Sequence, residues 1–278
     1  PQICSIKVDL ILLLIMRLIR RISGFLWLTG ALIITHLIAR SIFPENNVAV
    51  DLLLFNSIGV MASVIAFNAP LHTDRISANS FGAAALVWSM GSFFSTWNSF
   101  FELQIPAAIS DICYAIFYPL VFIAITRSFT QKRSMSALEV LDTVIIAVGL
   151  TSVLTAFVLK PAMVGLDGSA WQVFISILYP VGDIVLLSMV LVYLLLNPLS
   201  RRSIFLGLGL LSFATSDLFF IWGSLSATYE FGAITDDGWI IGLVLLSTSL
   251  LFSSPENKTS EKVSSYGATV ALIASGCL

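Results

Sequence analysis

"SILYPVGDIVLLSMVLVYLLL", residues 176–196, holds a single charged residue, Asp183, near the middle of an otherwise largely apolar run. About 20 apolar residues are enough for a helix to cross the hydrocarbon core of a bilayer. A charged, unpaired carboxylate at the centre of such a helix costs about 3 kcal/mol or more. The stretch therefore predicts a membrane-spanning helix, and Asp183 becomes a candidate functional residue.

The composition of the whole chain agrees with a membrane protein. Of its 278 residues, 58% are hydrophobic and only 11% are charged, and the mean hydropathy is +0.97. A soluble domain carries about 25% charged residues, so a water-soluble fold is excluded. The three cysteines, Cys4, Cys113 and Cys277, are far apart and two lie in apolar runs. Neither a disulfide framework nor a zinc site is indicated.

The pattern of apolar runs and polar breaks predicts eight complete spans, which form a bundle over residues 24–254. Residues 255–263 read as a cytoplasmic linker, and residues 264–278 as the start of a further span. At 1.5 Å per residue this last segment reaches only about 22 Å, short of the roughly 30 Å core. With no initiator Met, we expect a piece of a longer protein. The expected spans are 24–43, 51–70, 80–101, 107–127, 138–160, 171–197, 203–226 and 238–254.

Residues 1–23 precede the first span. Their apolar run is too short to cross a bilayer and leads into Arg17, Arg20 and Arg21, which favours an amphipathic cytoplasmic or interfacial segment. A cleaved signal peptide that ends near "IARS" is the other interpretation. An uncleaved anchor fits better, because the first span is long for the apolar region of a signal peptide.

The distribution of basic residues predicts the orientation. With the N-terminus in the cytoplasm, the alternating loops leave only Arg40 and Lys160 of the 14 basic residues on the outer side. This is the asymmetry expected of a multi-pass membrane protein whose N-terminus is cytoplasmic. The outer loops instead carry acids. The twelve cytoplasmic residues are Lys7, Arg17, Arg20, Arg21, Arg75, Arg127, Lys132, Arg133, Arg201, Arg202, Lys258 and Lys262.

Four acidic residues fall within predicted spans. Asp111 and Asp142 lie near span ends, whereas Asp183 and Asp217 both lie close to the bilayer midplane on antiparallel helices. No basic residue lies at that depth, so we expect at least one of the two to carry a proton. Tyrosines and a proline share the helical faces of these acids. The predicted ligand or signal pocket is Asp183, Asp217, Tyr179, Pro180, Asp111, Tyr114 and Tyr118.

Other polar residues receive structural interpretations. A stripe of Ser and Thr along the third span is typical of hydrogen-bonded helix adhesion; its members are Ser89, Ser92, Thr96 and Ser99. His36 and His72 fall on opposite sides of the membrane, so they cannot jointly ligate one haem, and we expect no special role for either.

Five stretches together resemble one family: "SDICYAIFYPL" (110–120), "LD" (141–142), "YPVGDIVLL" (179–187), "SD" (216–217) and "YEFGAITDDGWIIGLVLL" (229–246). They are similar to the multi-span membrane region that precedes GGDEF and EAL domains in bacterial cyclic-di-GMP signalling proteins. The resemblance covers roughly residues 80–255. It implies a sensory input module in the bacterial inner membrane. The catalytic output domain, a diguanylate cyclase or phosphodiesterase, would follow this chain, which has no GGDEF or EAL motif of its own.

Several other classes fit less well. A retinal protein needs a deep lysine, and Lys160 lies at an outer edge. The acids Asp183 and Asp217 could face each other as in an intramembrane aspartyl protease, but their flanks, "YPVGD" and "TSD", lack the Gly-x-Gly-Asp pattern of those enzymes. A small transporter remains an alternative interpretation, because proton relays use buried acids. A non-catalytic accessory subunit of a larger membrane complex is the other alternative.

The sequence thus predicts an all-α, polytopic membrane bundle that acts as a sensory module. We expect no catalytic residues and no metal ligands within the chain, and no cofactor can be assigned. The expected partners are the lipid bilayer and either a second copy of the chain or other membrane subunits; nucleic acid is not expected.

Overall fold

A computed structural model describes residues 23–43, 45–70, 72–130, 149, 152, 170–196, 199–226, 228–229 and 231–252. Within these ranges every regular element is a helix and no strand occurs, so the all-α prediction is confirmed. The elements are the helix Ser23–Ile42, η1 (Val48–Leu54), α2 (Phe55–Phe67), α3 (Arg75–Phe100), α4 (Ala107–Thr130), α7 (Ala170–Leu196), α8 (Arg201–Leu225), η3 (Ile234–Asp236) and α9 (Asp237–Ser249).

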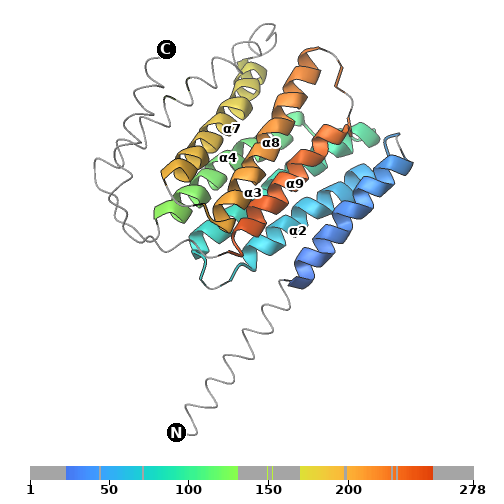
Figure 1. The fold of residues 1–278 in the computed structure, drawn as a ribbon. Helices are drawn as coiled ribbons and strands as arrows, with labels where there is room; N and C mark the ends of the chain where they lie inside the picture. Colours follow the sequence, from blue (N-terminus) through green and yellow to red (C-terminus); the bar gives the residue numbers. More distant parts are fainter. Residues whose placement is uncertain are drawn as a thin grey trace, which may run out of the picture.

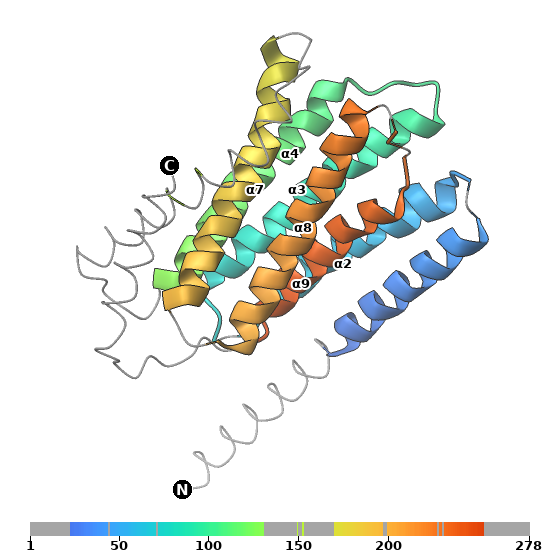
Figure 2. The same cartoon turned by 45° about the horizontal axis from the view of Figure 1, so that its top comes forward.

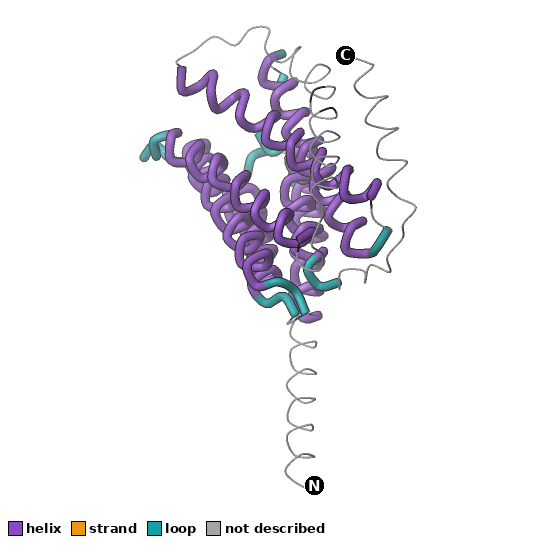
Figure 3. The backbone as a smooth tube through the Cα atoms, turned by 90° about the vertical axis from the view of Figure 1, so that its left-hand side faces the viewer, coloured by secondary structure: helices purple, strands orange, loops and turns teal. Residues whose placement is uncertain are grey.

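Six helices form a closed ring. Each of α2, α3, α4, α7 and α8 packs against the next described helix along the chain, and α9 returns to pack against α2. Figures 1 and 2 show these helices lying side by side, with the helix Ser23–Ile42 at the edge of the bundle next to α2. Figure 3 shows the described part from another side, again as helices joined by short loops.

Five described helices are long and apolar enough to cross a membrane, as a membrane protein requires: Ser23–Ile42, Val48–Phe67, Ala107–Ser128, Val173–Leu191 and Arg201–Ser224. The eight complete spans predicted from the sequence are not confirmed.

The other three predicted spans, 80–101, 138–160 and 238–254, do not correspond to any of these five helices. The predicted span 80–101 corresponds to α3, which is long enough but is diluted by Ser, Thr and Asn. The predicted span 238–254 corresponds to α9, whose 13 residues reach only about 20 Å. The predicted span 138–160, the segments 1–22 and 255–263, and the final segment 264–278 lie outside the described residues, apart from the helical residues 149 and 152.

The contact between α8 and α9 is made backbone against backbone. A Cβ atom added to Gly209 would lie 3.0 Å from the Gly242 carbonyl oxygen, and one added to Gly242 would lie 2.9 Å from the Gly209 carbonyl oxygen. The first distance is tighter than nine in ten real Cβ contacts and the second is shorter than real Cβ contacts, so glycine suits both positions. Close approach through small residues is a general means of helix association in membranes.

One end of the ring is filled by a polar cluster and is called here the closed end. Ser77 and Ser128 bridge α3 and α4 with a 2.8 Å hydrogen bond, and Arg202 of α8 donates to Ser128 over 2.9 Å. Arg127 meets both carboxylate oxygens of Asp74 at 3.2 Å, while Asp74 also caps the start of α3. Apolar residues fill the adjoining core: Ala66, Ala69, Ala78, Val121, Ala124, Ile125 and Leu250. Three helices are therefore tied together at this end.

Candidate functional site

The opposite end of the ring holds a cavity of about 460 Å³ and is called here the cavity end. The cavity extends from the residue 231–237 segment to Tyr118 and Asp217, in the middle parts of α4 and α8. Its volume lies in the range of pockets that enclose small organic ligands, roughly 300–1,000 Å³. A ligand of that size could be held within the bundle.

Aromatic side chains are the largest group in the wall of the cavity, with 11 of its 26 lining residues. Trp88 of α3 is the centre of this group: its ring centroid lies 5.8 Å from that of Phe213, 5.9 Å from that of Tyr114 and 6.1 Å from that of Trp239. Such spacings are those of interacting aromatic pairs. The aromatic lining residues are Phe55, Trp88, Tyr114, Phe117, Tyr118, Tyr179, Phe213, Phe220, Tyr229, Phe231 and Trp239.

Asp217 lies at the deep end of the cavity. Its carboxylate accepts a 3.0 Å hydrogen bond from the Tyr118 hydroxyl and another from the indole N–H of Trp239. Asp183 of α7 lies directly beside Asp217 and Tyr118 and is only 7% exposed. Its Oδ2 atom makes no hydrogen bond within the described part of the chain. Two carboxyl groups therefore meet at this depth with only neutral hydrogen-bond donors around them.

A second polar group lies along α4 and α7. Asp111 accepts a 3.2 Å hydrogen bond from the indole of Trp171. The Tyr179 hydroxyl lies beside Asp111 but is buried without a hydrogen bond in the described structure. The Ser110 hydroxyl, on a residue that is 95% buried, also lines the cavity without a partner. These hydroxyls are available to a molecule in the cavity.

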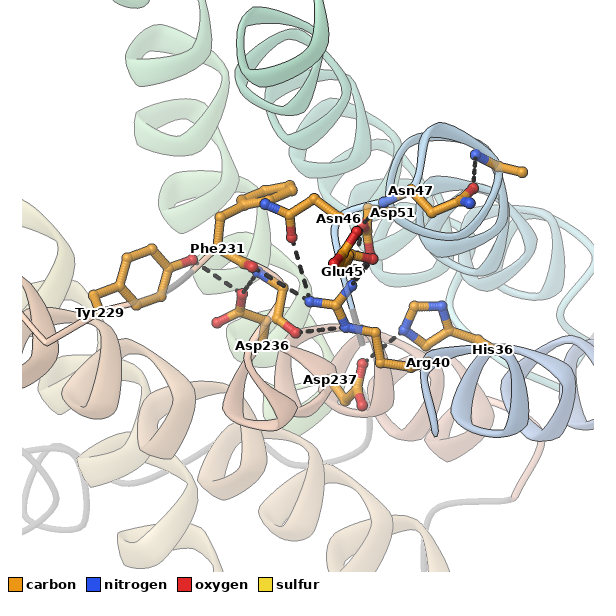
Figure 4. A network of polar contacts seen from close by, with 12 residues as sticks. His36, Arg40, Glu45, Asn46, Asn47, Asp51, Tyr229, Phe231, Asp236 and Asp237 are labelled. Carbon is orange, nitrogen blue, oxygen red and sulfur yellow. Dashed lines mark hydrogen bonds and ion pairs between the residues drawn. The ribbon is translucent and has the colours of Figure 1, made fainter. Parts of the chain in front are cut away.

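The mouth of the cavity joins three distant segments (Figure 4). Nε2 of His36 lies 2.9 Å from Oδ1 of Asp237, and Nη1 of Arg40 lies 3.2 Å from both carboxylate oxygens of Asp51. The Arg40 Nε also donates to the Gly232 carbonyl over 2.8 Å. Arg40 and His36 thus hold the helix Ser23–Ile42 against η1, the turn at Gly232 and the first residue of α9.

Asp51 reaches this position from an irregular helix. The π-helical segment η1 begins after Asn47, whose side chain accepts from the Ala49 N–H, and Asp51 in turn accepts from the Asn47 N–H over 2.7 Å. These two bonds satisfy backbone donors that a helix start leaves unpaired. Short π-helical segments are frequent at functional sites, and this one places a buried carboxylate on the cavity wall.

Asp236 completes the mouth. Its carboxylate accepts hydrogen bonds of 3.0 Å from both the Tyr229 hydroxyl and the Gly232 N–H. Burial raises the pKa of Asp236 to about 6, although these two bonds favour the charged form. Gly232 itself has φ +79°, and a Cβ there would lie within the Arg40 guanidinium group. The positive φ favours glycine at this turn, and a side chain here would also displace the Arg40 guanidinium group.

Comparisons of the chain with models of protein families, with characterised proteins and with solved structures find no match. The function is therefore argued from the cavity itself. The resemblance to membrane regions of cyclic-di-GMP signalling proteins stays a prediction.

Of the seven residues predicted to form a pocket, five line the cavity: Asp217, Tyr179, Asp111, Tyr114 and Tyr118. Asp183 lies behind Asp217, and Pro180 is buried inside α7 without lining the cavity. That these residues bind a ligand stays a prediction.

Sequence reasoning missed several residues. His36, for which no role was expected, is buried and pairs with Asp237. Three members of the Ser/Thr stripe, Ser92, Thr96 and Ser99, line the cavity, whereas Ser89 bonds the Ala85 carbonyl of its own helix. The excess of acids in the predicted outer loops was the available signal for this end of the molecule. Trp88 gave no signal, because a tryptophan in an apolar run is ordinary.

The described residues contain no group of three or more His, Cys, Asp or Glu side chains placed to hold a metal ion. The carboxyl groups of the cavity are instead spread along its length. Chemically, the site offers aromatic faces, dispersed negative charge and unpaired hydroxyls.

Proposed function

We propose that the chain is a membrane-embedded sensory input module and that the cavity is its ligand-binding site. The observation that carries the proposal is a cavity large enough for a small molecule, enclosed by a ring of helices and lined by aromatic and acidic side chains. Concave sites of this kind, apolar with a few convergent polar groups, are the usual form of small-molecule sites. The resemblance of residues 80–255 to sensor regions agrees with this role.

The closed end favours sensing over transport. Between the cavity and that end lie tightly packed residues such as Ala66, Val121 and Ile125, none of which is measurably exposed. The polar cluster around Ser77 and Arg202 lies beyond them. A transporter must open this end in each cycle, whereas a sensor needs only to transmit a change in helix positions. In the proposal, the output domain is cytoplasmic and the chain itself catalyses no reaction.

The test is a screen of small molecules for thermal stabilisation of the protein purified in detergent. A compound that binds the folded protein raises its melting temperature. Ser95→Trp is the blocking variant, because it adds an indole at an exposed position of the cavity wall. Ser41→Trp is the matched control, because it adds the same group on the helix Ser23–Ile42, outside the cavity. The proposal expects compounds that stabilise the wild type and Ser41→Trp but not Ser95→Trp.

Proteoliposomes then separate sensing from the alternatives. A sensor binds such a compound without accumulating it inside the vesicles, whether or not a proton gradient is imposed. Accumulation would establish a transporter instead. Stabilisation of Ser95→Trp as strong as that of the wild type would place binding elsewhere and would leave an accessory subunit as the better interpretation.

A further inference from the structure

The charge of the cavity is unbalanced. Five carboxyl groups line it, and only two of them, those of Asp51 and Asp237, have an arginine or histidine partner among the described residues. Tyr118 and Trp239, both neutral donors, bond Asp217, and Trp171 bonds Asp111. The carboxyl group of Asp183 also lies beside Asp217 and brings no positive charge. In a low-dielectric bundle an uncompensated carboxylate is unfavourable, so a positive charge brought by a ligand would be bound strongly.

The walls around the deep carboxylate suit a cation as well. The indole of Trp239 donates to Asp217, and the ring of Trp88 lies 6.1 Å from that of Trp239 and 5.9 Å from that of Tyr114. The face of an aromatic ring attracts a cation within about 6 Å of its centroid. Cages of aromatic rings are a known means by which proteins hold quaternary ammonium groups, and a carboxylate beside the rings adds charge attraction for an amine.

A second, independent observation points to a ligand. The Ser110 hydroxyl is buried, lines the cavity and lacks a hydrogen-bond partner, as does the Tyr179 hydroxyl. Buried polar atoms in native proteins are normally hydrogen-bonded, so partners for these two are expected from outside the described chain. Both can accept a hydrogen bond from an ammonium N–H.

On these grounds we propose that the cavity binds an organic cation, an amine with an apolar or aromatic body, whose ammonium group lies beside Asp217. The inference rests on the proposed function, because it names the ligand class of the same site. A bare metal ion is the poorer fit, since the carboxyl groups are dispersed and no compact ligand set occurs among the described residues. An anionic ligand would meet the same carboxylates with repulsion.

The experiment compares three probes that share one body and differ in charge: 4-phenylbutylamine, 4-phenylbutanol and 4-phenylbutyrate. Binding to the full chain in detergent is measured at pH 7 by titration calorimetry and by intrinsic tryptophan fluorescence, to which Trp88 and Trp239 of the cavity wall contribute. The amine should bind at least about tenfold more tightly than the alcohol, and the carboxylate no more tightly than the alcohol.

Variants of the protein then test which carboxylate binds the ammonium group. Asp217→Asn keeps an acceptor for Tyr118 and should lower the affinity for the amine at least about tenfold while leaving that for the alcohol unchanged. The matched control is Glu102→Gln, the same change at an exposed loop position that does not line the cavity. If Asp217→Asn loses the alcohol too, its fold is damaged, and Asp111→Asn serves as the second variant with the same expectation.

Each outcome decides between the two proposals. Alcohol binding equal to or tighter than amine binding, with both blocked in Ser95→Trp, overturns the cationic ligand but leaves the sensory cavity in place. Preferred binding of the carboxylate does the same. An unchanged amine-to-alcohol ratio in an Asp217→Asn variant that still binds the alcohol overturns the assignment of the charge to Asp217. Where Asp217→Asn has lost the alcohol, an unchanged ratio in Asp111→Asn overturns it. A dissociation constant above about 1 mM for the amine and the wild type also overturns the proposal of a cationic ligand, whatever the compound screen yields.

Discussion

Nε2 of His36 lies 2.9 Å from Oδ1 of Asp237, although 201 residues separate them in the chain. Both residues are buried, at 2% and 6% exposed. Asp237 is in the first turn of α9, where the helix dipole favours a negative charge. The pair connects the helix Ser23–Ile42, whose other side chains include the 81% exposed Trp27, to the wall of the cavity.

Replacing His36 should therefore loosen that helix. In His36→Ala the buried Asp237 loses its partner, and we expect the free energy of unfolding to fall by about 1–3 kcal/mol. Ser41→Ala, an exposed change on the same helix, should cost less than about 0.5 kcal/mol. Chemical denaturation in detergent micelles measures both. Equal effects of the two changes would show that the pair contributes little.

The turn at Gly232 should be intolerant of any side chain. Gly232→Ala places a Cβ at positive φ, which costs about 1–2 kcal/mol, and forces Arg40 away from Asp51. Gly30→Ala is the matched control, because a Cβ at Gly30 meets nothing within 4 Å. We expect a lower melting temperature for the first variant and an equal or higher one for the second. An unchanged melting temperature in Gly232→Ala would contradict the described turn.

Asp236 predicts a specific pH dependence. Its pKa is about 6 in the folded protein and near the ordinary 3.8 when unfolded. Between these values the unfolded chain has lost the proton and the folded chain keeps it, so stability falls as pH rises from about 4 to 6. Asp236→Asn lacks this contribution. The stability of the wild type minus that of the variant should decrease by up to about 3 kcal/mol over that range.

Melting temperatures measured at several pH values between 4 and 7 check this directly. The difference between wild type and Ser41→Ala, which adds no titrating group, should stay constant over the same range. A wild-type advantage over Asp236→Asn that grows with pH would mean that the folded protein favours the charged carboxylate, contrary to the expectation.

At the closed end, the cap that Asp74 makes at the start of α3 should contribute more to stability than its ion pair with Arg127. Arg127 is 44% exposed, so its pairing with Asp74 is worth at most about 1 kcal/mol. Asn keeps the helix cap that Asp74 makes to the Ser77 N–H, whereas Ala removes it at a further cost of about 1 kcal/mol. We expect Asp74→Ala to be clearly less stable than Asp74→Asn in urea titrations. If the two are equally destabilised, the ion pair dominates instead.

The predicted orientation can be checked by labelling with a membrane-impermeant thiol reagent. In a background without Cys4, Cys113 and Cys277, Ile234→Cys at the cavity end should be modified from outside the cell. Leu199→Cys at the other end should react only after permeabilisation. Both native residues are strongly exposed, at 80% and 72%, so accessibility differs only by side. The reverse pattern would invert the topology.

The all-helical fold and the interior position of the deep acids could be read from the sequence, because hydropathy and helical periodicity report directly on burial. Asp183, alone in an apolar run, is the clearest case. The number of spans is not confirmed. The sequence predicts spans at α3 and α9, but α3 is less apolar and α9 is shorter than the five helices that could cross a membrane, and both pack against neighbouring helices.

The contacts at the mouth of the cavity could not be predicted from the sequence for another reason. His36, Arg40, Asp51 and Asp237 come from segments that the sequence separates by up to 201 residues, and no local pattern pairs them. The stripe through Ser92 and Thr96 has the same sequence spacing whether it packs against another helix or lines a cavity. Only the packing of the helices in the ring determines which of the two it does.

The glycine contact between α8 and α9 has a consequence for the cavity. Gly209 and Gly242 bring the backbones of α8 and α9 into close contact, and this packing opposes rotation or sliding of one helix against the other. Asp217 on α8 and Trp239 on α9 therefore keep their separation when other helices shift. The carboxylate and the indole form a preorganised pair, and the entropy lost in fixing them is lost at folding, so a bound molecule does not have to supply it.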